Sequence, residues 1–200
     1  ALIVAVFAPQ DVAGWQLAVA LSLGVVLGEL IFGGRGFSFV QPAAAALALL
    51  SFSFPQIELQ AMPPALAIAA LPGAILLLIA GLISWRVIVA AAVMAALIFA
   101  LAGDAGSATG LAVALSVGLV FLIADPVSAA CTNPGRWLYG ALAGFLVAVF
   151  AGFTMDGPLS QAVVFAAVLS SVFAPLIDHL VVLANAYWRE RHSGNKGESR

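Results

Sequence analysis

Long apolar runs, separated by short clusters of Pro, Gly and charged residues, fill nearly the whole chain. The run ALAIAALPGAILLLIAGLI (residues 65–83) is apolar on every face, whereas a strand of a transmembrane barrel would alternate apolar and polar residues. Charged residues make up 8% of the 200 residues, against about 25% in soluble domains. The sequence therefore predicts an all-α, polytopic membrane helix bundle and excludes a soluble fold.

A helix needs about 20 apolar residues to cross a bilayer, and the interruptions in this chain recur at a similar interval. We predict seven to eight transmembrane or half-membrane helices, of which 38–54 and 137–154 are short for a full crossing. One transmembrane domain covers 1–186, and the polar tail 187–200 is expected to be disordered. The predicted segments are 1–8, 12–32, 38–54, 62–84, 87–103, 108–124, 137–154 and 159–186.

The basic residues predict how the helices are oriented. Alternate numbering of the gaps places Arg35, Arg86, Arg136 and the basic tail on one side of the membrane, with the acidic gaps on the other. Positively charged loops stay in the cytoplasm, so the C-terminus is predicted to be cytoplasmic. Seven Lys and Arg residues and a net charge of −2 leave no basic surface for a nucleic acid, so we expect no nucleic-acid partner.

Three acidic residues, Glu29, Asp125 and Asp178, lie in or against apolar segments. An ionisable group at membrane depth costs about 2.5 to 3.5 kcal/mol on insertion scales, so such residues are functional by default. In a structural interpretation, Asp125 caps the turn before Pro126, and Asp178 is hydrated near the cytoplasmic end of its helix. His179 is interpreted as a helix-end residue, because no second His or Cys lies one turn away, and no metal site is predicted.

The stretch LIADPVSAACTNPGRWLYG (122–140) predicts a broken helix. Asp-Pro stops the helix, and Ser128, Thr132 and Asn133 can satisfy the backbone groups that this interruption frees. Non-helical backbone near membrane depth is tolerated only where protein buries it or where it lines a cavity, which suggests a site. The pair Gln41-Pro42 has a similar plan, and paired proline interruptions indicate internal repeats with a binding site between them.

Several blocks of the sequence together resemble a known family. ADPVSAACTNPGRWLYGALAGFLVAV (124–149) and SSVFAPLIDHLVV (170–182) resemble the membrane subunits NqrB and RnfD, of the sodium-translocating quinone reductase and Rnf electron-transport complexes. SWR (84–86) and LGVVLGELIFGGRGFSFVQPA (23–43) resemble earlier blocks of the same family. The motif residues besides the two aspartates are Pro126, Ser128, Thr132, Arg136, Pro175 and His179.

The resemblance implies a fold of two five-helix repeats related to urea transporters, in a bacterial inner membrane. It implies electron transfer between flavins, coupled to movement of Na⁺ or H⁺, within a complex that contains other membrane, flavin and iron–sulfur subunits. The motif acids Asp125 and Asp178 would lie on the cation path, and we group Glu29 with them. The chain would then be a non-autonomous subunit of an oxidoreductase, since no residue holds an electron without a bound cofactor.

The chain also departs from the family pattern. The family's flavin-lining Asn residues are replaced by Ser38 and Gln41, and SFSFP (51–55) is followed by QIELQAMPP in place of the Ser-Gly-Ala-Thr motif that carries covalent FMN. A near match, DAGSATG (104–110), lies in a different loop and is one residue short, so Thr109 is a weak candidate beside an Asp/Ser helix cap. Noncovalent flavin, FMN or riboflavin, is the expected cofactor, and covalent FMN is not expected.

Two functions follow from this pattern. The leading hypothesis is a short RnfD/NqrB-like subunit that scaffolds flavin-based electron transfer coupled to Na⁺ or H⁺ movement. The alternative is a small-solute or cation transporter or channel on the same fold without redox chemistry, which the loss of the flavin residues favours. A structural remnant is a third possibility. A hydrolase is the weakest, because no nucleophile, base and orienting residue occur together at matching depth.

Overall fold

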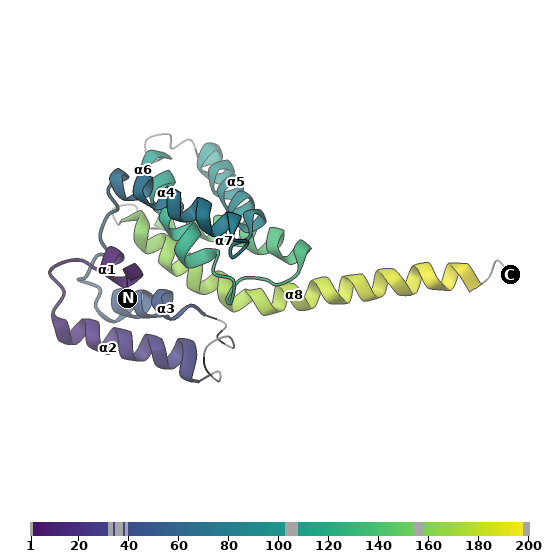
Figure 1. Ribbon diagram of the computed structural model, residues 1–200, viewed down its shortest axis with the longest axis horizontal. Helices are drawn as coiled ribbons and strands as arrows, with labels where there is room; N and C mark the ends of the chain where they lie inside the picture. The colour runs from purple at the N-terminus through teal and green to yellow at the C-terminus, as the bar shows by residue number, and fades with distance from the viewer. Residues whose placement is uncertain are drawn as a thin grey trace.

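The structure is a computed structural model that describes residues 2–31, 34, 38, 40–102, 108–153 and 158–197. Within these residues every regular element is a helix, which confirms the all-α class (Figure 1). The helices are α1 (Leu2–Phe7), α2 (Gly14–Val25), the π-helix η1 (Val26–Leu30), α3 (Pro42–Ser53), α4 (Pro64–Ile79), α5 (Trp85–Ala102), α6 (Ala108–Gly118), the π-helix η2 (Leu119–Ile123), α7 (Asn133–Phe153) and α8 (Leu159–Gly197).

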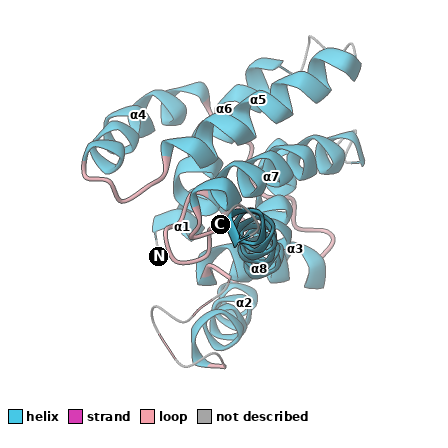
Figure 2. Ribbon diagram, turned by 90° about the vertical axis from the view of Figure 1, so that its right-hand side faces the viewer, coloured by secondary structure: helices cyan, strands magenta, loops and turns pink. Residues whose placement is uncertain are grey.

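Helix α8 lies between two groups of helices (Figure 2). On one side α3 packs against α8, and α2 and α1 pack against α3. On the other side α6, η2 and α7 contact α8, with α5 packed on α7 and α4 on α6. The segments on the two sides are far apart in the sequence, and α8 contacts helices of both groups.

Among the described residues, three helices, α5, α7 and α8, are by length and composition apolar enough to cross a membrane. Four shorter apolar helical stretches, Gly14–Leu30, Pro42–Ser53, Pro64–Ile79 and Ala112–Ile123, have 10–17 residues. The expectation that 137–154 is short was wrong: α7 begins at Asn133, because Pro134 fits the first turn of a helix, where its missing N–H is not needed. The segment 62–84 was predicted as a full span, and its helix α4 has 16 residues.

Helix α8 also ends later than predicted. It has 39 residues, continues through Pro175, and reaches Gly197, so residues 187–197 are helical rather than a disordered tail. Extending an existing helix avoids the cost of nucleation, and Arg and Glu favour helix, so polarity alone was a poor guide to this end. The second half of α8 projects beyond the rest of the bundle (Figure 1).

Small residues let neighbouring helices approach closely. A Cβ on Gly140 would lie 2.6 Å from the Val87 carbonyl oxygen, and one on Gly144 would lie 2.2 Å from the Ala91 carbonyl oxygen. Spacing of four residues between small side chains places both on one helix face, a known contact motif of membrane helices. Contacts from 140 to 87 and from 144 to 91 mean that α5 and α7 run in the same direction and start at the same end of the bundle.

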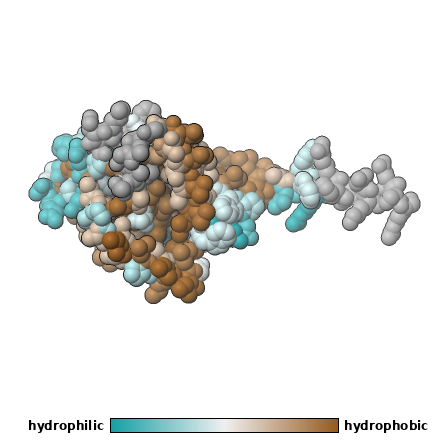
Figure 3. All heavy atoms as spheres, turned by 90° about the horizontal axis from the view of Figure 1, so that it is seen from above, coloured by the Kyte–Doolittle hydropathy of each residue, from teal (hydrophilic) through white to brown (hydrophobic). Residues whose placement is uncertain are grey.

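Much of the surface is apolar. Large side chains on α4 are exposed, with Ile79 82% and Ile68 67% accessible, and hydrophobic residues cover much of the visible face and continue onto the projecting part of α8 (Figure 3). Such a surface in a chain of this composition is the one that lipid solvates. Together with the three spanning helices, it identifies a membrane protein.

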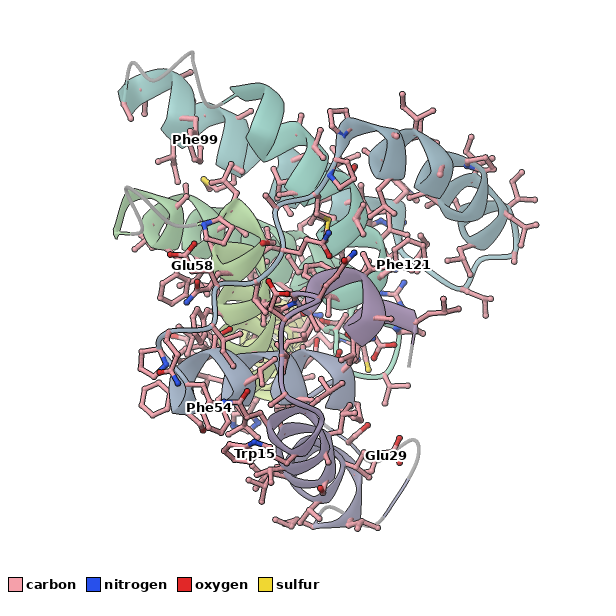
Figure 4. All side chains as sticks on the ribbon, turned by 90° about the vertical axis from the view of Figure 1, so that its left-hand side faces the viewer. Trp15, Glu29, Phe54, Glu58, Phe99 and Phe121 are labelled. Atoms are coloured by element: carbon pink, nitrogen blue, oxygen red, sulfur yellow. The ribbon has the colours of Figure 1, made fainter. Side chains whose placement is uncertain are left out.

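Aromatic residues lie near helix ends, as expected for residues at the level of the lipid headgroups. Trp85 opens α5 and packs edge-to-face on Trp137 in the first turns of α7, with ring centroids 5.5 Å apart. Trp15, the second residue of α2, packs in the same way on Phe54 just after α3, also at 5.5 Å (Figure 4). The first pair marks the end of the bundle where α5 and α7 begin.

Candidate functional site

The broken helix predicted between α6 and α7 is present as an irregular loop, residues 124–132. Asp178 of α8 holds this loop. Its Oδ2 accepts a hydrogen bond from the Cys131 backbone N–H (2.7 Å), and its Oδ1 accepts from the Thr132 backbone N–H (3.0 Å) and the Thr132 hydroxyl (2.5 Å). A carboxylate that accepts several N–H and O–H groups makes strong, charge-assisted bonds. Asp178 therefore fixes the loop that precedes α7.

The start of α7 is shaped around the same contact. The Thr132 hydroxyl, besides donating to Asp178, accepts from the Gly135 N–H at 3.2 Å, which caps the first turn of α7. A Cβ on Gly135 would lie 2.3 Å from Thr132 Oγ1 and 2.6 Å from Asp178 Oδ1. Only glycine leaves room for the carboxylate at this position.

Asp125 stabilises the first half of the loop. Its Oδ2 accepts from the Ser128 N–H at 3.2 Å and from the Ser128 hydroxyl at 3.1 Å, and the Ala129 N–H donates to the Asp125 carbonyl oxygen at 3.0 Å. The side chain thus accepts from the N–H three residues ahead, as an N-cap residue does, and this agrees with the interpretation that Asp125 caps the turn at Pro126. Asp125 Oδ1 makes no hydrogen bond within the described part of the protein. The half-buried carboxylate thus keeps one oxygen available.

Two distant side chains hold carbonyl groups in η2. The Phe121 carbonyl would pair five residues ahead with Pro126, which has no N–H, and the Gln41 Nε2 donates to it instead at 2.9 Å. The hydroxyl of Tyr139 donates to the Ile123 carbonyl oxygen at 3.1 Å. Gln41 Oε1 is buried and accepts no hydrogen bond from the residues that the structure describes.

Glu29 does not join the two aspartates. It is half-buried in η1, which packs against α3, and Figure 4 shows it well separated from Phe121, which precedes Asp125 by one turn. Among the described residues, no group of three His, Cys, Asp or Glu is arranged to hold a metal ion. The three acids grouped from the sequence therefore occupy two separate places.

The three candidate flavin residues come from two segments of the chain. Thr109 is the second residue of α6, and Phe121, which Gln41 contacts, lies about 18 Å farther along the chain axis in η2. The helix-cap residues expected before Thr109 fall in 103–107, outside the described residues. Ser38 is half-buried, and Gln41 uses its amide N–H₂ within the protein. Ser38 and Gln41 thus lie three positions apart just before α3, and Thr109 lies in α6.

The remaining motif residues lie in α8 and at the start of α7. Pro175 lies inside α8, where its side chain is exposed, and His179 is exposed without a hydrogen bond or ion pair to the described residues. Arg136 donates from Nε to the Ala130 carbonyl oxygen at 3.3 Å, and Arg86 donates from Nη1 to Asn133 Oδ1 at 3.0 Å. Arg86 and Arg136 thus lie at the same end of the bundle, as the alternation of charges predicted. Arg35 lies outside the described residues.

Two residues important to this arrangement were not singled out from the sequence. Tyr139 is fully buried and supports η2, and Gly135 makes room for Asp178. A lone Tyr inside an apolar helix is a signal that could have been used, since a buried hydroxyl needs a partner. No local signal reveals Gly135, because its constraint comes from a carboxylate on another helix.

Comparisons with known proteins place this sequence in one family. The model of the NQR2, RnfD, RnfE family matches residues 1–65 and 58–186. One subunit of the Na(+)-translocating NADH-quinone reductase of Pseudomonas aeruginosa is 27% identical over 93% of this chain and 59% of its own length. The corresponding subunits from Ectopseudomonas mendocina (27%, 90% and 58%) and Azotobacter vinelandii (26%, 88% and 57%) are similarly related. The chain thus spans a little over half the length of these relatives.

Proposed function

The chain belongs to the NQR2, RnfD, RnfE family, and from this premise we propose that it serves as a membrane subunit of an ion-translocating electron-transport complex. The observation that carries the proposal is the match through residue 186, which includes both the Asp125 loop and the Asp178 anchor. Relatives with this match are named as subunits of a Na(+)-translocating NADH-quinone reductase. The partners would be the other subunits of such a complex, in a bacterial inner membrane with the C-terminus in the cytoplasm.

Within this function the two loop aspartates would have different tasks. Both oxygens of Asp178 already accept hydrogen bonds, so it acts as the positioning residue of the loop. Asp125 keeps Oδ1 available, so it is the better candidate to contact a passing Na⁺ or H⁺. Glu29, on the other side of the bundle, would belong to a separate point of the path.

Any flavin would be held noncovalently at an interface that other subunits complete, since QIELQAMPP stands in place of the Ser-Gly-Ala-Thr motif and Gln41 already uses its amide N–H₂ within the protein. The absorption spectrum of the purified chain and of the purified complex, before and after acid precipitation, tests this. We expect no yellow precipitate from the chain, and flavin released into the acid supernatant from the complex. A yellow precipitate of the chain alone would contradict the proposal, because it would mean covalent flavin.

The ion-coupling role is tested by substitution of single carboxylates in membranes that contain the whole complex. Asp125→Asn is expected to raise the Na⁺ or H⁺ concentration needed for half-maximal quinone reduction, while the unfolding temperature of the chain changes little. Asp178→Asn should lower both the unfolding temperature and the activity. Asp11→Asn, at an exposed acid outside the loop, is the matched control and should change neither. Unchanged ion dependence in Asp125→Asn would refute the role of Asp125.

The alternative function, passage of a small solute or cation without redox chemistry, is favoured by the loss of the family's flavin residues, which Ser38, Gln41 and QIELQAMPP replace. It predicts flux through liposomes that contain the chain alone, abolished by Asp125→Asn. A role within a complex predicts no such flux and loss of quinone reduction in membranes that lack the chain. The two outcomes therefore separate the candidates.

A further inference from the structure

A second polar feature lies beside the loop. A pocket of about 520 Å³ opens between the segment that joins α4 to α5 and the loop 124–132. Its walls come from the end of α4, from residues 81–87, from the loop, and from the start of α7. It thus lies at the end of the bundle where α5 and α7 begin.

Two arginines give this pocket its charge. Arg86 and Arg136 both line it and both are half-buried. Each guanidinium has five N–H donors and makes one hydrogen bond in the described protein, to Asn133 and to Ala130 respectively. Within the described residues, neither guanidinium has a carboxylate at salt-bridge distance. Arg136 interacts electrostatically with Asp178 over a longer distance. Most donors of two cations therefore remain available to an anion.

A third polar group supports the same conclusion. Ser84 also lines the pocket, and its hydroxyl oxygen is buried without a hydrogen-bond partner among the described residues. A buried hydroxyl without a partner costs free energy, so such groups in native proteins usually have a ligand, a water or a protein partner. A hydroxyl and two guanidinium groups are the donors that bind phosphate oxygens.

The remaining wall of the pocket is apolar and includes a tryptophan. Ile79 and Leu82 line the pocket with 82% and 54% of their surface exposed, continuous with the apolar outer face of α4. Trp85 also lines the pocket and packs on Trp137. The Arg86 guanidinium carbon lies 5.4 Å from the centroid of the Trp85 ring. Because Trp prefers the membrane–water interface, an amphiphile could place its headgroup on the arginines and its acyl chains along α4.

We propose that this pocket binds the phosphate headgroup of an anionic phospholipid, with Arg86 and Arg136 on the phosphate and the acyl chains against α4. Basic pockets between transmembrane helices bind anionic headgroups in this way. A soluble phosphate would use the arginines and Ser84 but not the apolar wall. The exposed residues of α4 therefore favour the lipid over a free anion.

The test uses native mass spectrometry of the full chain in a neutral detergent with equal amounts of phosphatidylglycerol and phosphatidylcholine. We expect retained phosphatidylglycerol to predominate in the wild type. Arg86→Gln and Arg136→Gln should each lower that preference about fivefold, the effect of about one basic residue at a membrane surface. Arg189→Gln, at an exposed arginine outside the pocket, is the matched control and should leave it unchanged.

Three results would overturn the proposal. The first is a double Arg86→Gln, Arg136→Gln variant that keeps the wild-type preference. The second is a double Arg86→Lys, Arg136→Lys variant that loses the preference as completely as the Gln variant, since charge would then not be the cause. The third is displacement of the lipid by millimolar inorganic phosphate, which would mean that the pocket selects a free anion.

Discussion

The segments α2–η1–α3 and α6–η2–α7 have the same order of elements, but the hydrogen-bonding groups of the two segments find different kinds of partner. In the first, α2 ends in η1, and α3 begins at Pro42. In the second, α6 ends in η2, and Pro134 is in the first turn of α7. In both, a pair of glycines four residues apart brings a neighbouring helix close: Gly24 and Gly28 in the first part approach α3, and the pair in α7 approaches α5.

The difference lies in where the side chains of each part make their bonds. Gln41 in the first part reaches the Phe121 carbonyl in the second, across 80 positions of sequence. The second part also receives Tyr139 from its own α7 and Asp178 from α8. Polar side chains from three regions thus converge on η2 and the loop after it. This convergence identifies the second interruption as the one that the fold holds in a defined shape.

The largest expected effect comes from removal of the anchor of that loop. Asp178→Ala would leave two N–H groups and the Thr132 hydroxyl without their acceptor, at a cost of about 3 to 5 kcal/mol in the free energy of unfolding. Unfolding of the purified protein in mixed micelles with increasing denaturing detergent measures it. Asp11→Ala is the control. Equal stability of the two variants would contradict the conclusion that the fold holds η2 and the loop after it in a defined shape.

Substitution of the contact glycines tests whether α2 packs on α3 as closely as α7 packs on α5. Gly144→Ala would place a Cβ 2.2 Å from the Ala91 carbonyl oxygen, and Gly24→Ala would place one 2.6 Å from the Ala46 Cβ. Both face backbone or a short side chain that cannot move aside, so each should cost about 2 to 3 kcal/mol in the same unfolding measurement. Gly152→Ala, with no atom within 4 Å, should be neutral or slightly stabilising. A loss in Gly152→Ala as large as in Gly144→Ala would argue against close packing as the cause.

The smallest effects come from the two side chains that hold η2. Tyr139→Phe removes the donor to the Ile123 carbonyl in a buried site and should cost about 1 to 2 kcal/mol. Gln41→Leu removes the donor to Phe121 but also the buried Oε1 that has no partner, so its cost should be about 1 kcal/mol or less. Unfolding of the single and double variants measures both. A larger loss in Gln41→Leu than in Tyr139→Phe would make the first part the main support of η2.

Local sequence was sufficient where a local rule decides the outcome. Asp125-Pro126 ended a helix as predicted, because proline cannot supply the N–H that helix continuation requires. The same kind of rule failed at helix ends that depend on context. Asn133-Pro134 begins α7 earlier than its polarity suggested, and α8 continues past 186 because an established helix extends at little cost.

The sequence predicted most residues of the candidate site but not the hydrogen bonds that join them. The sequence indicated Asp125, Asp178, Ser128 and Thr132 as polar groups with a role, and all four lie in or on one loop. It grouped Glu29 with them, and the structure places that residue elsewhere. The division of tasks between the two aspartates became visible only from which of their oxygens accept hydrogen bonds.

Composition and short motifs were enough to predict the membrane environment, the helical class and the family. Each of these depends on residue types and on spacings between residues close in the sequence. The partner of each polar group was decided by tertiary structure alone. Asp178 meets Thr132 across 46 positions, and Gln41 meets Phe121 across 80. Such pairs form because a backbone group left without a helical partner, by proline at Phe121 and by the irregular loop at Thr132, must find a donor or acceptor wherever helix packing brings one, and no local pattern encodes that place.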